Sequence, residues 1–268
     1  MADRLTIGIV QVGRRGGSWR NSLNNVVSLL DSVRDLSDVD VLFFPENWLS
    51  RKPIFLEDYY YVGDVLSRYA PIVFVGLSYV RVEKGVLSLG IASVEGKHNI
   101  VCEKIFPSKA VGERGLIVSG RYHPPIEIDE FWRVGCVACV DVFYPETSRL
   151  LVVDGANIIY NPASIPLDRI DLWHSVLKTR ASENIVYTIG VNGVGNVYPD
   201  GRLTPGRSII ISPGSKKGEI AGSSSTVYVT SLNRSEILEQ RKRWAFYDDI
   251  VNKLSRFYRD LKEVLMSE

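Results

Sequence analysis

The sequence predicts an α/β fold in a single domain, and three observations lead to that prediction. Apolar runs of strand length alternate with segments whose apolar residues recur at helical spacing, an order typical of a sheet with helices packed against it. The chain has 268 residues, enough to bury a large core. No linker-like stretch interrupts it, so we expect residues 1–268 to fold as one unit.

The first half of the chain reads as strand, helix, strand and then further strands. Residues 5–10 form an apolar run of strand length, and a loop rich in Gly and Arg follows at 13–17. Apolar residues at helical spacing between Leu23 and Val33 predict a helix before the next strand, 41–44. Further elements are predicted as a helix over 55–69 and strands at 72–75, 87–94 and 100–104.

The second half repeats this alternation and ends in helices. Strands are predicted at 134–139, 157–161, 186–191 and 208–211, and helices at 145–152 and 171–184. Asn233 and Glu236 have the spacing of a capping box, which predicts a C-terminal helical extension over about 233–268. Its apolar stripe is expected either to cover the parent domain or to bury itself in a second subunit: Ile250, Leu254, Phe257, Leu261 and Leu265.

Composition narrows the class of function. Lys plus Arg number 32 and Asp plus Glu 31, so the chain lacks the basic excess of a nucleic-acid binder or a polybasic membrane anchor, and a small ligand is expected. The apolar run at 5–10 is too short for a signal segment or a membrane span, which favours a cytoplasmic protein. The chain has three cysteines, which cannot all pair with one another, and reduced thiols are expected.

Cys139 is the strongest candidate for a nucleophile. It lies where an apolar strand runs into a polar turn, followed by Asp141 and Glu146, and a helix starting at Pro145 would direct its positive end toward a thiolate. Cys136 lies three residues earlier, so on a continuous strand its side chain would point to the opposite face. The Cys-x-x-Cys spacing alone indicates a redox pair or half of a zinc site, but no second Cys pair or suitably spaced His completes a metal site.

Two other predicted strands end in groups that complement a thiol. Glu46 follows the strand at 41–44, and a desolvated carboxylate there would have a raised pKa suited to proton transfer near neutrality. Lys104 ends the strand at 100–104 and would stabilise a thiolate or an oxyanion. Taken singly, such residues are more often a helix-capping Glu, a solvated Lys and a buried core Cys.

The three segments together, in this order, resemble the nitrilase or carbon-nitrogen hydrolase superfamily. The resemblance rests on Phe44-Pro45-Glu46, on Lys104 and on Cys139-x-Asp141-x-x-x-Pro145-Glu146. Other segments that resemble the family are Gly155 to Ala163, Arg180 to Asn184, Gly206 to Ser208 and Pro213-Gly214. The resemblance implies a four-layer αββα sandwich and places Glu46, Lys104 and Cys139 on the family's catalytic Glu-Lys-Cys positions. Glu113 is similar in placement to an additional glutamate of many members, and two units of the family often pair.

Departures from the family pattern bear on the substrate. Val140 and Phe143 stand where amidase-like members usually have Tyr and Arg, and loss of that Arg removes an anchor for an acidic substrate group unless another base serves. The retained Asp141 and Pro145-Glu146 resemble the amidase branch. We therefore expect hydrolysis of a small linear amide through a Cys139 thioester, with the backbone N–H of Val140 and Lys104 binding the oxyanion.

Several alternatives stay open. The same site could act as a nitrilase or on N-carbamoyl amides, and a homologue without catalytic activity could serve as a regulatory or scaffold protein. A metal-dependent phosphoesterase could use Glu46 and Asn47 on a divalent ion, but that leaves Lys104 and Cys139 without a role. For the preferred hypothesis no cofactor or metal is expected, the partners are a small amide or nitrile and a second copy of the chain, and the assembly is a homodimer or a higher homo-oligomer.

Overall fold

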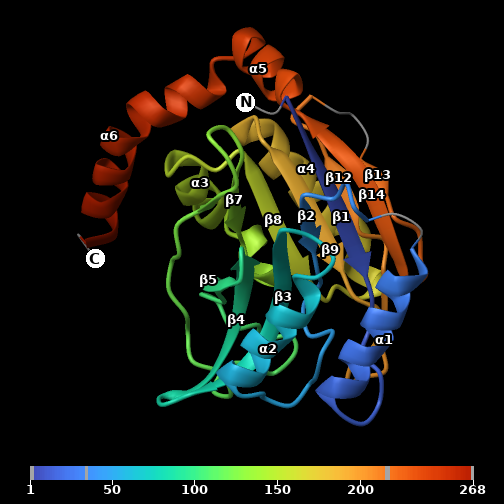
Figure 1. Ribbon diagram of the computed structural model, residues 1–268. Coiled ribbons are helices and arrows are strands. Elements are labelled where there is room, and N and C mark those ends of the chain that lie inside the picture. Colours follow the sequence, from blue (N-terminus) through green and yellow to red (C-terminus); the bar gives the residue numbers. More distant parts are fainter. Residues whose placement is uncertain (1–2, 34–35, 215–217, 267–268) are drawn as a thin grey trace.

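The computed structural model describes residues 3–33, 36–214 and 218–266, and within them two six-stranded sheets face each other (Figure 1). Helices α1 (Trp19–Ser32) and α2 (Leu56–Leu66) cover the outer face of one sheet. Helices α3 (Pro145–Val153) and α4 (Ile170–Asn184) cover the outer face of the other. This is the predicted αββα sandwich.

The first sheet holds the N-terminal strands and one late strand. Its order is β14 (Thr226–Asn233), β1 (Arg4–Gln11), β2 (Val41–Phe43), β3 (Ile72–Val82), β4 (Gly85–Val94) and β5 (Lys97–Glu103). Strands β1, β2 and β3 are parallel, in a register that aligns Ile9 with Phe43 and Phe43 with Phe74. The other pairs in this sheet are antiparallel.

The second sheet has the same design, with three parallel strands in its middle. Its order is β13 (Glu219–Ile220), β12 (Ile209–Ile211), β9 (Tyr187–Asn192), β8 (Ile158–Ala163), β7 (Arg133–Cys136) and β6 (Ile126–Glu127). Strands β7, β8 and β9 are the parallel ones. Short 3-10 helices η1 (Cys139–Phe143) and η2 (Leu167–Arg169) and a small ribbon of β10 (Val194–Val197) and β11 (Leu203–Pro205) lie in the connections.

Alternating side chains on the first sheet build two cores. Ile9 and Phe43 point toward the second sheet, and Phe43 meets Phe74 and Tyr160 at ring-centroid distances of 5.1 Å and 4.8 Å. Their neighbours in sequence, such as Val10 and Phe44, pack with α1 and α2 instead. Both faces of these strands are therefore buried, as expected for parallel strands covered by layers on each side.

Several elements differ from the sequence prediction. Strand β3 extends to Val82, beyond the predicted 72–75, and the short strand β6 was not predicted. The strand expected at 134–139 ends at Cys136, because the chain turns into η1 at Cys139, whose φ is 41°. Strand β14 was not predicted, although residues 226–230 have the β-branched and aromatic composition of a strand. The β10–β11 ribbon was also missed, because its strands are short and lie in a region rich in turn residues.

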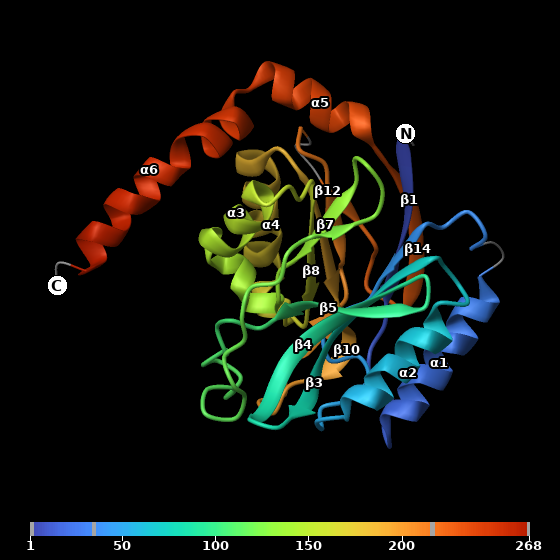
Figure 2. The same cartoon turned by 60° about the vertical axis from the view of Figure 1, so that its left-hand side comes forward.

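The C-terminal extension forms α5 (Arg234–Arg243) and α6 (Phe246–Met266). Asn233 is the N-cap residue of α5, but its side chain contacts the Glu236 carboxylate at 3.3 Å in place of a backbone N–H. Helix α6 starts against the body and then projects away from it (Figure 2). Ile250 is buried while Phe257 is 60% exposed, and the side chains of Leu261 and Leu265 lie outside the described residues.

In the described parts of the chain, no helix combines the length and the apolar composition needed to cross a bilayer.

Candidate active site

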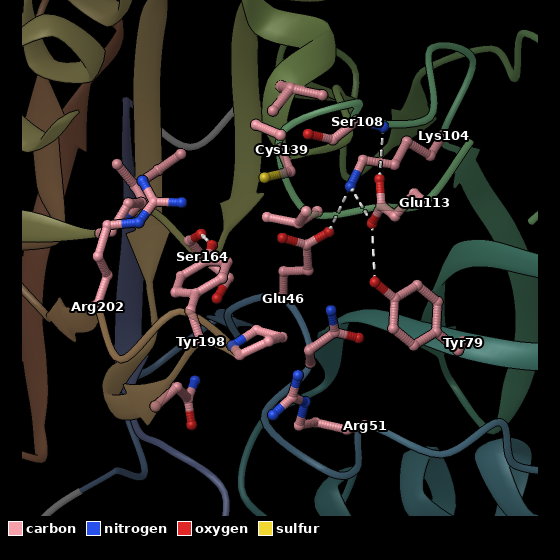
Figure 3. Close-up of a pocket in the computed structure, with 18 of the residues that line it drawn as sticks. Glu46, Arg51, Tyr79, Lys104, Ser108, Glu113, Cys139, Ser164, Tyr198 and Arg202 are labelled. Carbon is pink, nitrogen blue, oxygen red and sulfur yellow. Dashed lines mark hydrogen bonds and ion pairs between the residues drawn. The ribbon is translucent and has the colours of Figure 1, made fainter. Parts of the chain in front are cut away.

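The side chains of Glu46, Lys104 and Cys139 line one cavity of about 710 Å³. Figure 3 shows them converging from three different segments of the chain. Glu46 follows β2 and Lys104 follows β5 in the first sheet, whereas Cys139 follows β7 in the second. Two sheets thus contribute to one site through residues just beyond their strand ends, where α/β folds commonly bind ligands.

Glu46 is fixed by backbone contacts with both sheets. Its N–H donates to the carbonyl of Ala163 at the end of β8 (3.3 Å), and the next N–H, of Asn47, donates to Leu77 in β3 (2.7 Å). Asn47 has a φ of 54°, so the chain turns sharply after Glu46. The Glu46 side chain is 3% exposed, and its position is therefore well determined by packing.

Lys104 lies between two carboxylates in the interior. Its Nζ donates to Glu46 Oε1 at 2.9 Å and to Glu113 Oε1 at 2.8 Å. Burial by itself lowers the pKa of Lys104, but the negative groups around it, Glu46 first among them, raise that pKa well above its usual value. The ammonium is therefore charged, and it lies between the carboxyl groups of Glu46 and Glu113.

Both carboxylate oxygens of Glu113 accept hydrogen bonds within this cluster. Besides Lys104, its Oε1 accepts a hydrogen bond from the hydroxyl of Tyr79 at 2.8 Å, and its Oε2 accepts one from the N–H of Ser108 at 2.7 Å (Figure 3). From the resemblance, Glu113 was predicted only as a possible supporting residue that follows the lysine in sequence. The structure places it in direct contact with Lys104, where it fixes the direction of the ammonium.

Cys139 lies on a sharp turn and not on a strand. Its φ of 41° belongs to the left-handed region, which is unusual for a residue with a side chain. The buried amide of Asn161 donates from Nδ2 to the carbonyls of Val137 (2.6 Å) and Cys139 (3.0 Å), and its Oδ1 accepts from the indole N–H of Trp173 at 2.7 Å. The strand-parity reason for choosing Cys139 over Cys136 is therefore wrong, since a turn separates them.

The electrostatic setting keeps the Cys139 thiol neutral at rest. Burial raises its pKa, the adjacent Glu46 carboxylate raises it further by its charge and a hydrogen bond, and Lys104 lowers it. A base must therefore take the proton as the thiolate forms, and Glu46 is the carboxylate in position to do so.

The two residues at which the sequence departs from its family also line the cavity. Val140 is the second residue of η1, and Phe143 is its last. Arg180 of α4 holds this turn, because its Nε donates to the carbonyl of Val142 (3.0 Å) and its Nη2 to that of Phe143 (3.4 Å). Arg180 is thus committed to positioning η1.

Asp141 joins the loop of Lys104 to the turn of Cys139. Its carboxylate accepts hydrogen bonds from the N–H groups of Ile105 (2.7 Å) and Phe106 (3.1 Å), directly after Lys104. Burial raises its pKa to about 6 from an ordinary 3.8, although these two hydrogen bonds and the charge of Lys104 oppose the rise. Asp141 is a positioning residue that sets the spacing of Lys104 and Cys139.

The raised pKa of Asp141 predicts a stability that falls with pH. Its contribution to folding is most favourable below the unfolded pKa of 3.8 and is lost as pH rises through about 6. The difference of about 2 units corresponds to at most about 3 kcal/mol. The free energy of unfolding of the wild type, measured in urea relative to Asp141→Asn, should fall by up to this amount between about pH 4 and pH 7. A difference in the free energy of unfolding that does not change with pH contradicts the prediction. Asp260→Asn is the control, because Asp260 is exposed.

Cys136 has a different environment from Cys139. It lies in the sheet-to-sheet core, and burial with a contact to the Cys102 thiol raises its pKa. Within the described parts of the chain, no cluster of three His, Cys, Asp or Glu side chains has the geometry to hold a metal ion. The Cys-x-x-Cys spacing therefore corresponds to one core thiol and one thiol in the cavity.

Several residues of the site were not foreseen from the sequence. Tyr79 and Asn161 support Glu113 and Cys139, and Tyr198 and Arg14 line the cavity from the β10–β11 ribbon and from the loop after β1. Asn161 belongs to the segment that resembles the family, which is a signal that could have identified it. No sequence pattern marked Arg14 or Tyr198.

The αββα sandwich and its buried carboxylate, ammonium and thiol define a hydrolase of the nitrilase superfamily type. The family model for carbon-nitrogen hydrolases matches residues 6–241, and the chain belongs to this family. The resemblance inferred from the sequence is thereby confirmed.

Sequence relatives of the chain are hydrolases and amidases. It is 30% identical over 150 residues to the "hydrolase in agr operon" of Staphylococcus aureus, which covers 55% of this chain and 56% of that protein. It is 29% identical to the 2-oxoglutaramate amidase of Bacillus subtilis (strain 168), over 60% of this chain and 61% of that protein. The matches thus span little more than half of the length of these relatives.

Solved structures show the same fold at low sequence identity. The carbon-nitrogen hydrolase of Helicobacter pylori G27 aligns with a TM-score of 0.83 and 18% identity, covering 97% of this chain and 98% of that one. An amidase of Nesterenkonia sp. AN1 aligns with a TM-score of 0.71 and 17% identity, covering 90% and 96% of the two chains. That structure, of a glutamate-to-glutamine mutant, carries the acetamide moiety of fluoroacetamide on its active-site cysteine.

Proposed function

We propose that the protein is a cysteine-dependent amidase that converts a small linear amide to a carboxylic acid and ammonia. One observation carries the proposal: the Lys104 ammonium is held between Glu46 and Glu113 in the wall of the cavity that also contains the Cys139 thiol. The choice of an amide over a nitrile rests on Asp141 and Pro145-Glu146, which resemble the amidase branch, because the sequence relatives include a nitrilase as well as amidases. Nitriles and N-carbamoyl amides are the alternative substrates for the same residues.

The proposed reaction uses Glu46 twice as a base. Glu46 accepts the proton of Cys139, and the thiolate attacks the amide carbonyl while Lys104 and the backbone N–H of Val140 stabilise the oxyanion. The protonated Glu46 then gives its proton to the departing ammonia, and the acyl group stays on sulfur as a thioester. Glu46 next activates the water that hydrolyses this thioester and releases the acid. Glu113 keeps the ammonium of Lys104 directed at the reacting carbonyl.

The acyl-enzyme gives a direct test. We expect the wild type, quenched with acid during turnover of a reactive amide, to carry a Cys139 thioester, and Glu46→Gln to form little of it, because the thiol has lost the base that takes its proton. Intact-protein and peptide mass spectrometry should show the mass of the acyl group on the peptide of Cys139 and none in Cys139→Ala. The wild type should release ammonia from members of a panel of aliphatic and ω-amides.

Two outcomes contradict the proposal. Ammonia release from nitriles but not from their matching amides would move the protein to the nitrile-cleaving alternative. Activity that survives Cys139→Ala but is lost with a chelator would indicate metal-dependent chemistry. Glu103→Gln is a matched control, since Glu103 is also buried next to Lys104 in sequence but contacts His123 and the backbone of Arg121.

A further inference from the structure

Among the described residues, four arginines line the cavity of Cys139: Arg14, Arg51, Arg169 and Arg202. They differ in whether a carboxylate lies near the guanidinium. Arg202 forms an ion pair with Asp200 at 2.9 Å, and Arg169 lies 3.9 Å from Asp168. Neither Arg14 nor Arg51 has a carboxylate within ion-pair distance among the described residues. Two positive charges in the cavity wall are therefore left without an acidic partner.

Arg14 is placed next to the predicted catalytic base. Its Nη1 donates to the backbone carbonyl of Asn47 at 3.1 Å, and Asn47 directly follows Glu46. A guanidinium has more N–H donors than this one contact uses, so planar bidentate contact with a carboxylate remains available. Arg51 makes one long contact of 3.5 Å, from its Nη1 to the carbonyl of Val197.

The backbone of Arg14 is held rigidly against the β10–β11 ribbon. Its N–H donates to Asn196 Oδ1 at 2.9 Å, and the N–H of Val194 donates to the carbonyl of Val12 at 3.3 Å. Between them, Gly13 approaches the ribbon so closely that a Cβ atom would lie 1.9 Å from the carbonyl oxygen of Val194. Only glycine fits there, and the backbone from which the Arg14 side chain extends is fixed in advance, which lowers the entropic cost of binding.

The charges around Arg14 favour an anion from outside the protein. Burial lowers the pKa of Arg14 and the charge of Arg51 lowers it further, while Glu46 acts in the opposite direction from its place beside Lys104. Arg14 is half-buried and Arg51 is exposed, and an anionic ligand between them would offset the repulsion of the two positive charges.

We propose that the substrate amide carries a carboxylate, which Arg14 binds with Arg51 beside it. This rests on the proposed amidase function and specifies its substrate class. The sequence lost the usual arginine at Phe143, and the loop after β1 supplies a cation in its place. Apolar side chains of the same cavity, Val111, Leu116 and Ile117, suit the methylene groups between the amide and the carboxylate.

The test compares two primary amides of equal length, glutaramate and pentanamide, which differ in a carboxylate and a methyl group. We expect the wild type to favour glutaramate. Arg14→Gln should lower the ratio of kcat/KM for glutaramate to kcat/KM for pentanamide by about 30-fold or more, as loss of a charge-assisted contact does. Arg14→Lys should recover part of the loss, because it keeps the charge without the planar fork. Arg51→Gln should have the smaller effect of the two.

Arg169→Gln is the matched control, since Arg169 lines the same cavity but lies beside Asp168. A second arm uses N-acetylglycine, which carries the carboxylate on the leaving amine, and measures released glycine. Equal turnover of glutaramate and pentanamide, with no Arg14-dependent preference in either arm, overturns the inference and leaves the amidase function standing. Failure of the amidase function is seen separately, as absence of any Cys139-dependent turnover or thioester with all of these amides.

Discussion

Replacing Lys104 with methionine is expected to destabilise the fold by about 3–5 kcal/mol, the usual cost of removing one partner of a buried ion pair. Methionine fills a similar volume, so the loss comes from charge and not from a cavity. Glu46 and Glu113, with side chains 3% and 5% exposed, would then face each other without the ammonium that both contact. Turnover should fall by at least about 10³-fold, because an oxyanion donor is lost as well.

The stability effect is measured by urea denaturation, and turnover by ammonia release from an active amide. Lys109→Met is the matched control, because Lys109 lies in the same loop but is exposed. The double variant Lys104→Met with Glu113→Gln should recover part of the stability, since only one buried carboxylate remains. A Lys104→Met protein as stable as the wild type contradicts the ion-pair argument.

Replacing Cys139 with alanine is expected to reduce turnover by at least about 10⁴-fold, because no other group in the cavity can form the thioester. The fold should be little affected, because alanine keeps the Cβ atom and the same backbone conformation, and the lost sulfur lines the cavity, so that no sealed void forms. Iodoacetamide should label the wild-type thiol and lose this label in the variant. Turnover that survives the substitution excludes the proposed nucleophile.

Cys136 provides a control three residues away. Cys136→Ala removes a sulfur from the core between the sheets, so we expect a loss of about 1 kcal/mol in stability and no more than a small change in kcat. The two variants together separate a thiol that reacts from a thiol that packs. The opposite result would assign the chemistry to Cys136.

Much of the fold was predictable because its signals are local. The helices α1 and α4 and strands such as β1 and β8 have clear apolar periodicity, and the structure contains each of them close to the predicted bounds. Strand β14 completes the first sheet by pairing with β1 across more than two hundred positions of sequence. Such a pairing depends on tertiary contacts, which local periodicity does not report.

In the site, too, local sequence signals identified some residues, while others depend on tertiary contacts. Glu46 and Lys104 were candidates because of their positions at the ends of apolar strands, and the resemblance to the family combined them with Cys139. The structure brings Glu46 and Lys104 into contact. Their catalytic roles, with that of Cys139, stay predictions. The bend at Cys139 depends on Asn161 and Trp173 from other elements, so strand parity could not reveal it. Arg14 could not be identified either, because only the folded structure shows that, among the described residues, no carboxylate lies within ion-pair distance of its guanidinium.

The cavity lies between the two sheets, and its reactive groups come from both of them. The N-terminal half of the chain supplies the carboxylates and the ammonium, and the C-terminal half supplies the thiol, so neither half contains a complete set. Asp141 and the contact of Glu46 with Ala163 connect the two sheets. The proposed activation of Cys139 by Glu46 and Lys104 therefore requires the docked sandwich, and a nascent or partly opened chain that exposes Cys139 would carry an unassisted thiol.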